Sequence, residues 1–264
     1  MPRNEYQPFL ATVKEVIRHT DIEYTFRLAY EGPVKPGQFF EVSIPKFGEA
    51  PISVSGIEPG LIDLTIRRVG RVTNELFEHY ADRKLFLRGP YGNGFNVDDY
   101  RGRELVVIAG GTGVSPVRGL VEHFANHPEE VRGLTLVAGF KSPQDILFYN
   151  DFSRWATKIN LILTVDAGEG PAHCQVGLVT EHIPQLKIQD ASNAAAIVVG
   201  PPVMMRFAIQ GLLAAGFAEH NIWISQERKM CCGIGKCGHC RINDVYVCLN
   251  GPVFNYTQGK TLVD

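Results

Sequence analysis

Long hydrophobic runs are missing from this sequence of 264 residues. No segment approaches the roughly 18 consecutive apolar residues that a membrane-spanning helix needs. The first residues, MPRNEYQPFLATVKEV, lack the apolar centre of a secretion signal. We therefore expect neither a membrane span nor export. The cytoplasm is the expected compartment, and thiols there stay reduced.

An excess of charge of one sign is also missing. The formal net charge is −2, 20% of the residues are charged, and Lys and Arg form no block. Nothing therefore indicates a nucleic-acid partner. The sequence shows no Ser-His-Asp set, paired carboxylates or zinc-hydrolase pattern either. We expect a globular protein of two domains, without a side chain that acts as a general acid or base.

Short strand-like segments fill the first hundred residues, with Gly and Pro between them. Between Leu61 and Arg67, apolar and polar residues alternate, as in a strand with one buried face. The expected strands cover residues 10–17, 24–30, 38–44, 51–56 and 61–68. This spacing predicts an antiparallel barrel or sandwich, interrupted by one helix from Thr73 to Tyr80. The stretch LRGPYGNGF, from Leu87 to Phe95, predicts turns.

The pattern changes after Asp99 to Arg103, where we place the domain boundary. Four apolar runs follow, separated by segments of helix length, at residues 104–110, 134–140, 159–166 and 195–200. Such runs are typical of buried parallel strands in an α/β domain. The remaining residues, 226–264, read as loops with one hairpin around Asn243 and Asp244.

Five of the six cysteines lie between Met230 and Cys248, in MCCGIGKCGHCRINDVYVC. Four of them have the spacing C-x4-C-x2-C-x7-C, whose first three members match plant-type [2Fe–2S] proteins: Cys232, Cys237, Cys240 and Cys248. The glycines between them let backbone N–H groups approach the sulfur atoms. A zinc site is the alternative, although only one C-x2-C pair is present.

The other two cysteines, Cys231 and Cys174, are expected to be ordinary unligated thiols. His239 lies inside the cysteine segment, but the histidine count and spacing of a Rieske centre are absent. We interpret His239 as a solvated loop residue.

Glycines also mark a strand-to-helix turn in VVIAGGTGVSPVRGL, where a helix is expected to open near Ser115 and Pro116. At such a turn, backbone N–H groups can approach a pyrophosphate. The pattern is not G-x-G-x-x-G, so a plain glycine turn is the alternative. A second turn, in VVGPPVMM, ends another apolar run at Gly200 and would complete a nucleotide site at the carboxyl ends of the strands.

Asp166 ends the run LILTVD. An acid there would accept hydrogen bonds from a ribose 2′-OH and repel a 2′-phosphate, which favours NADH over NADPH. A plain turn aspartate is the alternative. Met204 likewise is either a neighbour of the nucleotide or a core residue of the helix that follows.

Several separated motifs, in order, carry a family resemblance: GEAPISVS, VVIAGGTGVSPV, AIVVGPPVM, CGIGKCGHCR, VYVC and GPVFNY. The chain resembles the ferredoxin–NADP reductase superfamily, in the branch with a C-terminal [2Fe–2S] loop. That branch includes the electron-transfer subunit of dihydroorotate dehydrogenase, the gamma subunits of sulfhydrogenases and the corresponding subunit of anaerobic sulfite reductase, which is the most similar. The resemblance implies an FAD-binding β-barrel over 1–100, an NAD(H)-binding α/β domain over 101–225 and a cluster-binding segment over 226–264.

The resemblance also implies cofactor-binding residues. For FAD they are Ala50, Pro51, Ile52, Ser53, Ile66, Arg67, Arg68, Val72 and Thr73. For NAD they are Gly110, Gly111, Thr112, Gly113, Asp166, Gly200, Pro201 and Met204. The four metal ligands remain those named above. Glu227 is either a neighbour of the flavin or a surface ion-pair partner.

Two departures from the family pattern stand out. Ala50 occupies the place of the arginine that contacts the flavin pyrophosphate. Arg67 or Arg68 would then supply the positive charge, unless both are solvated residues at a strand edge. Val199 occupies a place where the family often has cysteine.

The function implied by the resemblance is electron transfer from NADH through FAD and a [2Fe–2S] cluster to a catalytic partner subunit. The most similar family predicts anaerobic sulfite reduction to sulfide, in a hetero-oligomer with a further iron–sulfur subunit. The same module feeding dihydroorotate dehydrogenase or a sulfhydrogenase is one alternative. A non-catalytic binding protein with a zinc knuckle is another.

Overall fold

The computed structural model describes residues 4–79, 84–171 and 174–262. They form two compact units. The first unit combines the chain up to Phe95 with Gln226–Val253, and the second combines Asn96–Ser225 with Phe254–Thr261. Most of the cysteine segment therefore packs with the N-terminal strands, from which it is distant in sequence.

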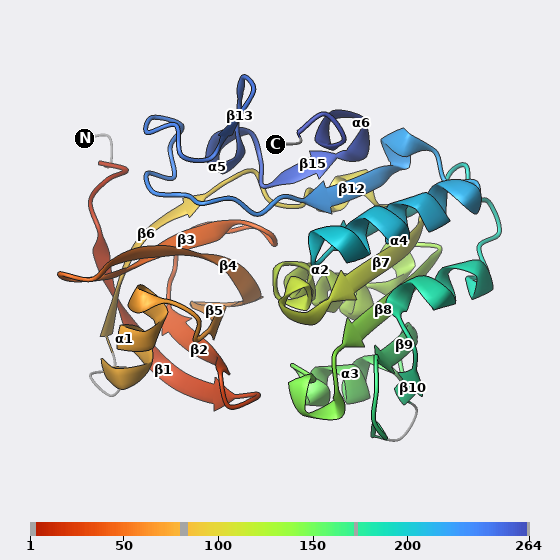
Figure 1. Cartoon of the computed structure of the whole chain (residues 1–264), viewed down its shortest axis with the longest axis horizontal. Coiled ribbons are helices and arrows are strands. Elements are labelled where there is room, and N and C mark those ends of the chain that lie inside the picture. The colour runs from red at the N-terminus through yellow and green to blue at the C-terminus, as the bar shows by residue number, and fades with distance from the viewer. Residues whose placement is uncertain (1–3, 80–83, 172–173, 263–264) are drawn as a thin grey trace. The chain divides into compact units, whose positions relative to one another are not determined.

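A closed antiparallel barrel forms the centre of the first unit, coloured red to yellow in Figure 1. Its strands are β1 (Phe9–Arg18), β2 (Glu23–Ala29), β3 (Phe39–Ile44), β4 (Gly48–Glu58), β5 (Leu61–Arg67) and β6 (Lys84–Tyr91). They are hydrogen-bonded in the order β1-β2-β5-β4-β3-β6. The predicted barrel is confirmed, and each predicted strand ends within about three residues of the observed one.

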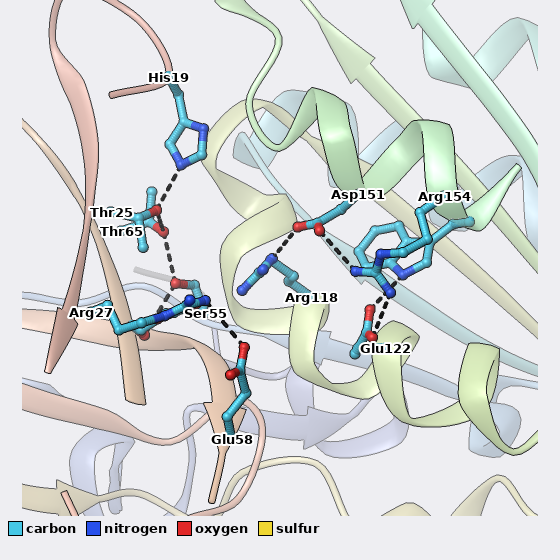
Figure 2. A network of polar contacts seen from close by, with 12 residues as sticks. His19, Thr25, Arg27, Ser55, Glu58, Thr65, Arg118, Glu122, Asp151 and Arg154 are labelled. Atoms are coloured by element: carbon cyan, nitrogen blue, oxygen red, sulfur yellow. Dashed lines mark hydrogen bonds and ion pairs between the residues drawn. The ribbon is translucent and has the colours of Figure 1, made fainter. Parts of the chain in front are cut away.

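Alternation along β5 explains the barrel's core. Ile62, Leu64 and Ile66 point inward and are buried. Asp63 points outward, where it forms a two-pronged ion pair with Arg27 on β2 (2.9 and 3.1 Å). Beside it, hydroxyl groups of neighbouring strands form a hydrogen-bonded chain that ends at His19, shown in Figure 2.

The turn predicted over Leu87–Phe95 is wrong in its first half, because β6 continues to Tyr91. β6 pairs with both β1 and β3 and thereby closes the barrel. The strand tolerates Gly89 because the register against β3 shifts at this place and Gly89 has a φ of 128°. Barrel closure is a long-range effect that local turn residues do not reveal.

One helix, α1 (Arg71–His79), follows β5. It begins two residues before the predicted start at Thr73, and the predicted end at Tyr80 lies outside the described residues. The Thr73 hydroxyl accepts hydrogen bonds from the N–H groups of Val69 and Gly70 (both 3.0 Å), which fixes the approach to the helix.

A mainly parallel sheet forms the second unit, as predicted, and is coloured yellow-green to blue in Figure 1. Its strands are β7 (Glu104–Gly110), β8 (Gly133–Phe140), β9 (Asn160–Val165), β10 (Cys174–Val176), β11 (Ala195–Val199), β12 (Ile222–Ser225) and β15 (Val253–Asn255). Its helices are α2 (Val114–Asn126), α3 (Tyr149–Trp155), α4 (Pro202–Ala214) and α6 (Tyr256–Gly259). The strand order is β10-β9-β8-β7-β11-β12-β15.

The order of these strands reverses direction at β7. Successive strands β8, β9 and β10 extend to one side, whereas β11 and β12 lie on the other side. Since β7 and β11 pair in parallel from Ala195↔Leu105 to Val199↔Ala109, their carboxyl ends meet at one edge. Such a reversal is where α/β sheets bind ligands.

The cysteine segment contains a short hairpin, β13 (Arg241–Ile242) and β14 (Val245–Tyr246), as predicted. Asn243 in its turn has a φ of 52°, a conformation that asparagine tolerates. A single helical turn, α5 (Val247–Asn250), follows and carries Cys248. In the described part of the chain, no helix has the length and apolar character needed to cross a membrane.

Candidate functional site

The four predicted metal ligands lie together, and backbone N–H groups point at three of their sulfur atoms. Lys236 N donates to Cys232 Sγ (3.3 Å), Gly235 N to Cys248 Sγ (3.2 Å) and Cys248 N to Cys240 Sγ (3.4 Å). We call this arrangement the cysteine cradle: the thiols of Cys232, Cys237, Cys240 and Cys248 with these three N–H groups.

Glycines shape the cradle. Gly233 and Gly235 both have positive φ, 77° and 70°. A Cβ on Gly233 would lie 2.4 Å from the Tyr91 ring, and one on Gly235 would lie 2.9 Å from Leu249. Only glycine therefore allows this loop to lie so close to its neighbours.

The four thiols differ in exposure and form two pairs. Cys237 is exposed, whereas the other three are buried. The N–H of His239 lowers the pKa of the Cys237 thiol, to which the Cys232 thiol also hydrogen-bonds. Burial raises the pKa of Cys248 to about 12, and a hydrogen bond with the Cys240 thiol acts in the same direction. The cradle thus pairs Cys232 with Cys237 and Cys240 with Cys248.

Cys174 is distant from these pairs in sequence, whereas Cys231 adjoins Cys232 and lies close enough to Cys232 and Cys237 for both to raise the pKa of its thiol. Each is half-buried, and burial is the main cause that raises the pKa of each thiol. His239 is exposed, as expected of a solvated loop residue.

Arg88 on β6 ties the cysteine segment to the barrel, a role that sequence reasoning missed. Its guanidinium forms a two-pronged ion pair with Glu49 on β4 (2.8 and 2.5 Å). It also donates to the Tyr91 hydroxyl (3.0 Å) and to the backbone carbonyls of Cys231 (2.9 Å) and Cys232 (3.0 Å). The stretch LRGPYGNGF around Arg88 predicts only turns, which indicate no chemistry for this arginine.

Glu41 on β3 is the register partner of Arg88 and is fully buried. Neither carboxyl oxygen accepts a hydrogen bond from the described residues. Burial raises the pKa of Glu41 to about 8, with Glu49 and Cys232 adding to the rise and Arg88 opposing it. The carboxyl is therefore mostly protonated at neutral pH.

The first group of predicted flavin residues forms one half-buried stretch of β4, Ala50 to Ser53. Ile66, by contrast, is fully buried in the barrel core. Only its backbone remains to contact a flavin. Glu227 is exposed and lies in the extended approach to the cysteine cradle.

The charge missing at Ala50 has three nearby candidates. Arg67 pairs with Glu23 (3.1 Å), and Arg68 pairs with Glu78 on α1 (3.1 Å). Arg71, which was not predicted, begins α1; its guanidinium lies 5.5 Å from the ring centre of Phe47, just before β4.

The neighbours of Arg71 offer other donors. Val72 is half-buried in the first helical turn, whose N–H groups have no partner within the helix. The Thr73 hydroxyl is occupied by Val69 and Gly70. The backbone N–H of Thr73 therefore suits a phosphate better than its hydroxyl does.

The two predicted glycine turns come together at the strand reversal of the second unit. Gly111–Gly113 form a short 3-10 turn between β7 and α2. A Cβ on Gly113 would lie 2.5 Å from the Val199 carbonyl oxygen, and one on Gly110 would lie 2.4 Å from Met204 Sδ. The structure thus places Gly110 beside Pro201 and Met204, and Gly113 beside Gly200. Gly111 and Thr112 lie between them in the same turn, and a Cβ on Gly111 would meet no atom within 4 Å.

The helix after the first turn begins at Val114, so Ser115 is not its cap as expected. Ser115 lies in the first turn, where its hydroxyl is buried and has no hydrogen-bond partner among the described residues. Asp166 is exposed just after β9, two strands away from β7. Neighbouring strands lie about 4.8 Å apart, so Asp166 is about 10 Å from β7 across the sheet.

Ion pairs join α2 to α3 in the second unit, as Figure 2 shows. Arg118 donates to Asp151 (2.6 Å), which also accepts from Arg154 (2.9 Å). Arg154 and the Trp155 indole N–H both donate to Glu122 (2.6 and 2.7 Å). These contacts fix α2, whose N-terminus adjoins the glycine turn.

Two family models match the chain. One is described as an oxidoreductase NAD-binding domain and matches residues 107–210. The other is described as the iron–sulfur cluster binding domain of dihydroorotate dehydrogenase B and matches residues 227–258. The matched ranges contain both glycine turns and all four cradle cysteines.

Curated relatives match over nearly the whole chain. The gamma subunits of sulfhydrogenases 1 and 2 of Pyrococcus furiosus are 33% and 35% identical; each match covers 96% of this chain, and 92% and 96% of the relatives. The electron-transfer subunit of dihydroorotate dehydrogenase B (NAD+) from Clostridium perfringens is 27% identical. That match covers 94% of this chain and 96% of the relative.

Among solved structures, that of NADH-dependent reduced ferredoxin–NADP oxidoreductase, studied for flavin-based electron bifurcation, superposes with a TM-score of 0.78. The superposition covers 97% of this chain and 90% of the solved chain, and the two sequences are 22% identical. This likeness confirms the fold.

Proposed function

Because the chain belongs to the ferredoxin–NADP reductase-like family of iron–sulfur electron-transfer subunits, we propose that it oxidises NADH and passes the electrons through FAD and a [2Fe–2S] cluster to a catalytic partner subunit. When bound, these groups supply hydride acceptance, conversion from two-electron to one-electron transfer, and outward delivery of single electrons. The protein's own residues bind and orient them.

The cysteine cradle is the observation that carries this proposal. Two pairs of thiols suit two iron atoms, whereas one zinc ion needs its ligands to converge on one point. The N–H groups of Gly235, Lys236 and Cys248 would stabilise the negative charge on the sulfurs.

The strand reversal supplies the nucleotide site. The first-turn N–H groups of α2 suit pyrophosphate oxygens. The Ser115 hydroxyl in the same turn is buried and has no hydrogen-bond partner among the described residues. Pro201 and Met204 border the same turn. Asp166 would accept hydrogen bonds from a ribose 2′-OH, so we expect a preference for NADH.

The flavin would bind along Ala50–Ser53 and the first turn of α1. Arg71, with Arg67 and Arg68 nearby in sequence, offers the positive charge that Ala50 lacks. Because Ile66 is buried, it would contribute through its backbone alone.

For the final acceptor we propose sulfite, reduced on a partner subunit together with a further iron–sulfur subunit, on the sequence motifs that resemble the electron-transfer subunit of anaerobic sulfite reductase. The second candidate is a hydrogenase-type partner. It is favoured by identities of 33% and 35% with sulfhydrogenase gamma subunits over nearly the full length.

Absorbance and metal content of the anaerobically purified protein test the electron path. We expect flavin bands, about two iron atoms and about two acid-labile sulfides per chain, and bleaching by NADH that is faster than bleaching by NADPH. Zinc in place of iron would refute the cluster. A preference for NADPH would refute the role of Asp166.

Copurification tests the acceptor. Partner subunits are isolated with the native protein, and the complex is supplied with NADH and, in turn, sulfite or protons. Sulfide production from sulfite supports the first candidate. Hydrogen production, or hydrogen-dependent NAD+ reduction, without sulfite turnover supports the second candidate and contradicts the first.

A further inference from the structure

Arg88 uses every hydrogen-bond donor that it has. A guanidinium carries five N–H groups, and the five bonds go to Glu49 (two), the Tyr91 hydroxyl and the carbonyls of Cys231 and Cys232. Arg88 is only 4% exposed. We call these groups the Arg88 anchor.

The anchor is rigid on the barrel side. Glu49 holds the guanidinium plane in a fork-to-fork geometry. The Tyr91 hydroxyl accepts from Arg88 and donates to the Glu5 carbonyl (2.5 Å). The ring of Tyr91 also lies against Gly233, the residue after Cys232. The barrel therefore fixes the position of the backbone at Cys231 and Cys232.

Folding stability by itself gives little reason to bury an arginine. Burying an ion pair often stabilises a fold less than apolar residues of similar size would. Here the positive charge lies one hydrogen bond from the backbone of Cys232, the first cradle ligand. Glu41, whose carboxyl is the cross-strand partner of Arg88, has no hydrogen bond from the described residues, because the donors of Arg88 are all used elsewhere.

We infer that Arg88 is a positioning residue for the cluster, an inference that rests on the proposed function. Arg88 fixes the cradle on the flavin-binding barrel, and its positive charge favours the reduced form of the cluster. Reduction adds one negative charge to the cluster, so a nearby buried cation makes the midpoint potential less negative. Fixing the cradle also keeps the distance from the flavin constant, on which the rate of electron transfer depends.

Two substitutions separate charge from geometry. Arg88→Gln removes both the charge and the five-donor fork. Arg88→Lys keeps the charge, but an ammonium group has only three donors and cannot reproduce the fork. Arg27→Gln is the matched control, because Arg27 forms a similar two-pronged ion pair with Asp63 elsewhere on the barrel.

The wild-type protein is first assayed for iron, sulfide, flavin and bleaching by NADH; failure there contradicts the proposed function, not the role of Arg88. Cluster potential is then measured by a redox titration followed by electron paramagnetic resonance, and flavin-to-cluster transfer by stopped flow. Flavin content and melting temperature report on folding.

We expect Arg88→Gln to shift the midpoint potential to more negative values and to slow flavin-to-cluster transfer at least tenfold. Arg88→Lys should keep the potential close to wild type and slow transfer about as much. Arg27→Gln should change neither. Loss of iron from Arg88→Gln alone, with flavin content like that of Arg27→Gln, also supports the anchor. Wild-type potential and rate in Arg88→Gln, or equal effects in Arg27→Gln, would overturn the inference.

Discussion

At the scale of single residues, a few side chains under the cysteine cradle carry much of the electrostatics. Arg88 is a permanent cation paired with Glu49, and Glu41 beside it is buried without a hydrogen-bond partner among the described residues. A second carboxylate there would lie in a site that excludes water, so its neutral form is favoured. The charge state of Glu41 therefore links the barrel's stability to pH.

The expected consequence is a loss of stability as pH rises. The pKa of Glu41 is about 8 in the folded chain and about 4.3 in an unfolded chain. Between these values the folded chain holds the extra proton. The contribution of Glu41 to the free energy of unfolding is then largest below about pH 4.3 and falls toward pH 8, by roughly 3 to 5 kcal/mol at about 1.4 kcal/mol per pKa unit.

Urea unfolding of the loaded protein at several pH values between 5 and 8 measures this slope. Glu41→Gln, which stays neutral, should flatten the dependence relative to wild type. Glu58→Gln changes an exposed carboxyl on β4 and should leave the slope as it is. Equal slopes in wild type and Glu41→Gln would show that Glu41 does not titrate in this range.

At the scale of elements, the proposed nucleotide site depends on two turns that share one edge of the sheet. Gly110–Gly113 follows β7, and Gly200 follows β11, the parallel neighbour of β7. Their backbones approach so closely that side chains are excluded on both sides. This contact, more than the glycine spacing of either turn, makes the edge suitable for a pyrophosphate.

Gly113→Ala is therefore expected to weaken NADH binding about tenfold and to lower stability by about 1–3 kcal/mol, since its Cβ would meet the Val199 carbonyl oxygen at 2.5 Å. A nucleotide titration and the melting temperature measure the two effects. Gly133→Ala is the matched control at the start of β8, where no atom lies within 4 Å. If Gly113→Ala binds NADH as tightly as the wild type, the glycine turn is not part of the nucleotide site.

At the scale of the whole molecule, the two compact units hold different parts of the proposed path. One contains the barrel and the cysteine cradle, and the other contains the proposed nucleotide site. Within the cradle, Cys237 is the exposed thiol. We therefore expect single electrons to leave the protein near Cys237.

Removing one predicted cluster ligand should stop electron transfer beyond the flavin but leave electron transfer from NADH to the flavin intact. Cys240→Ser is expected to retain bleaching by NADH and ferricyanide reduction within about twofold, because the flavin donates directly to ferricyanide. Electron delivery to the copurified partner should fall at least a hundredfold. Cys231→Ser, which alters the neighbouring thiol outside the cradle, should keep full iron content and delivery. Equal losses in both variants would contradict the assignment of ligands.

Local patterns in the sequence were sufficient for much of this protein. Apolar alternation predicted β5, buried runs predicted β7, β8, β9 and β11, and cysteine spacing placed four thiols together, because each signal depends on residues close along the chain. The β6 strand was missed, since its pairing with β1 and β3 depends on closure of the barrel. The start of α2 at Val114 lies within one residue of the predicted opening near Ser115.

The sequence by itself determined the order of the barrel, the parallel sheet and the cysteine segment, and it identified the residue types suited to iron, nucleotide and flavin. Only the tertiary structure decided that Gly110 and Gly200 meet, that Arg88 holds the backbone of Cys231 and Cys232, and that Glu41 is buried beside it. The physical reason is distance along the chain: these groups lie 90 to 144 residues apart or on different strands, and only the folded barrel and sheet bring them within contact.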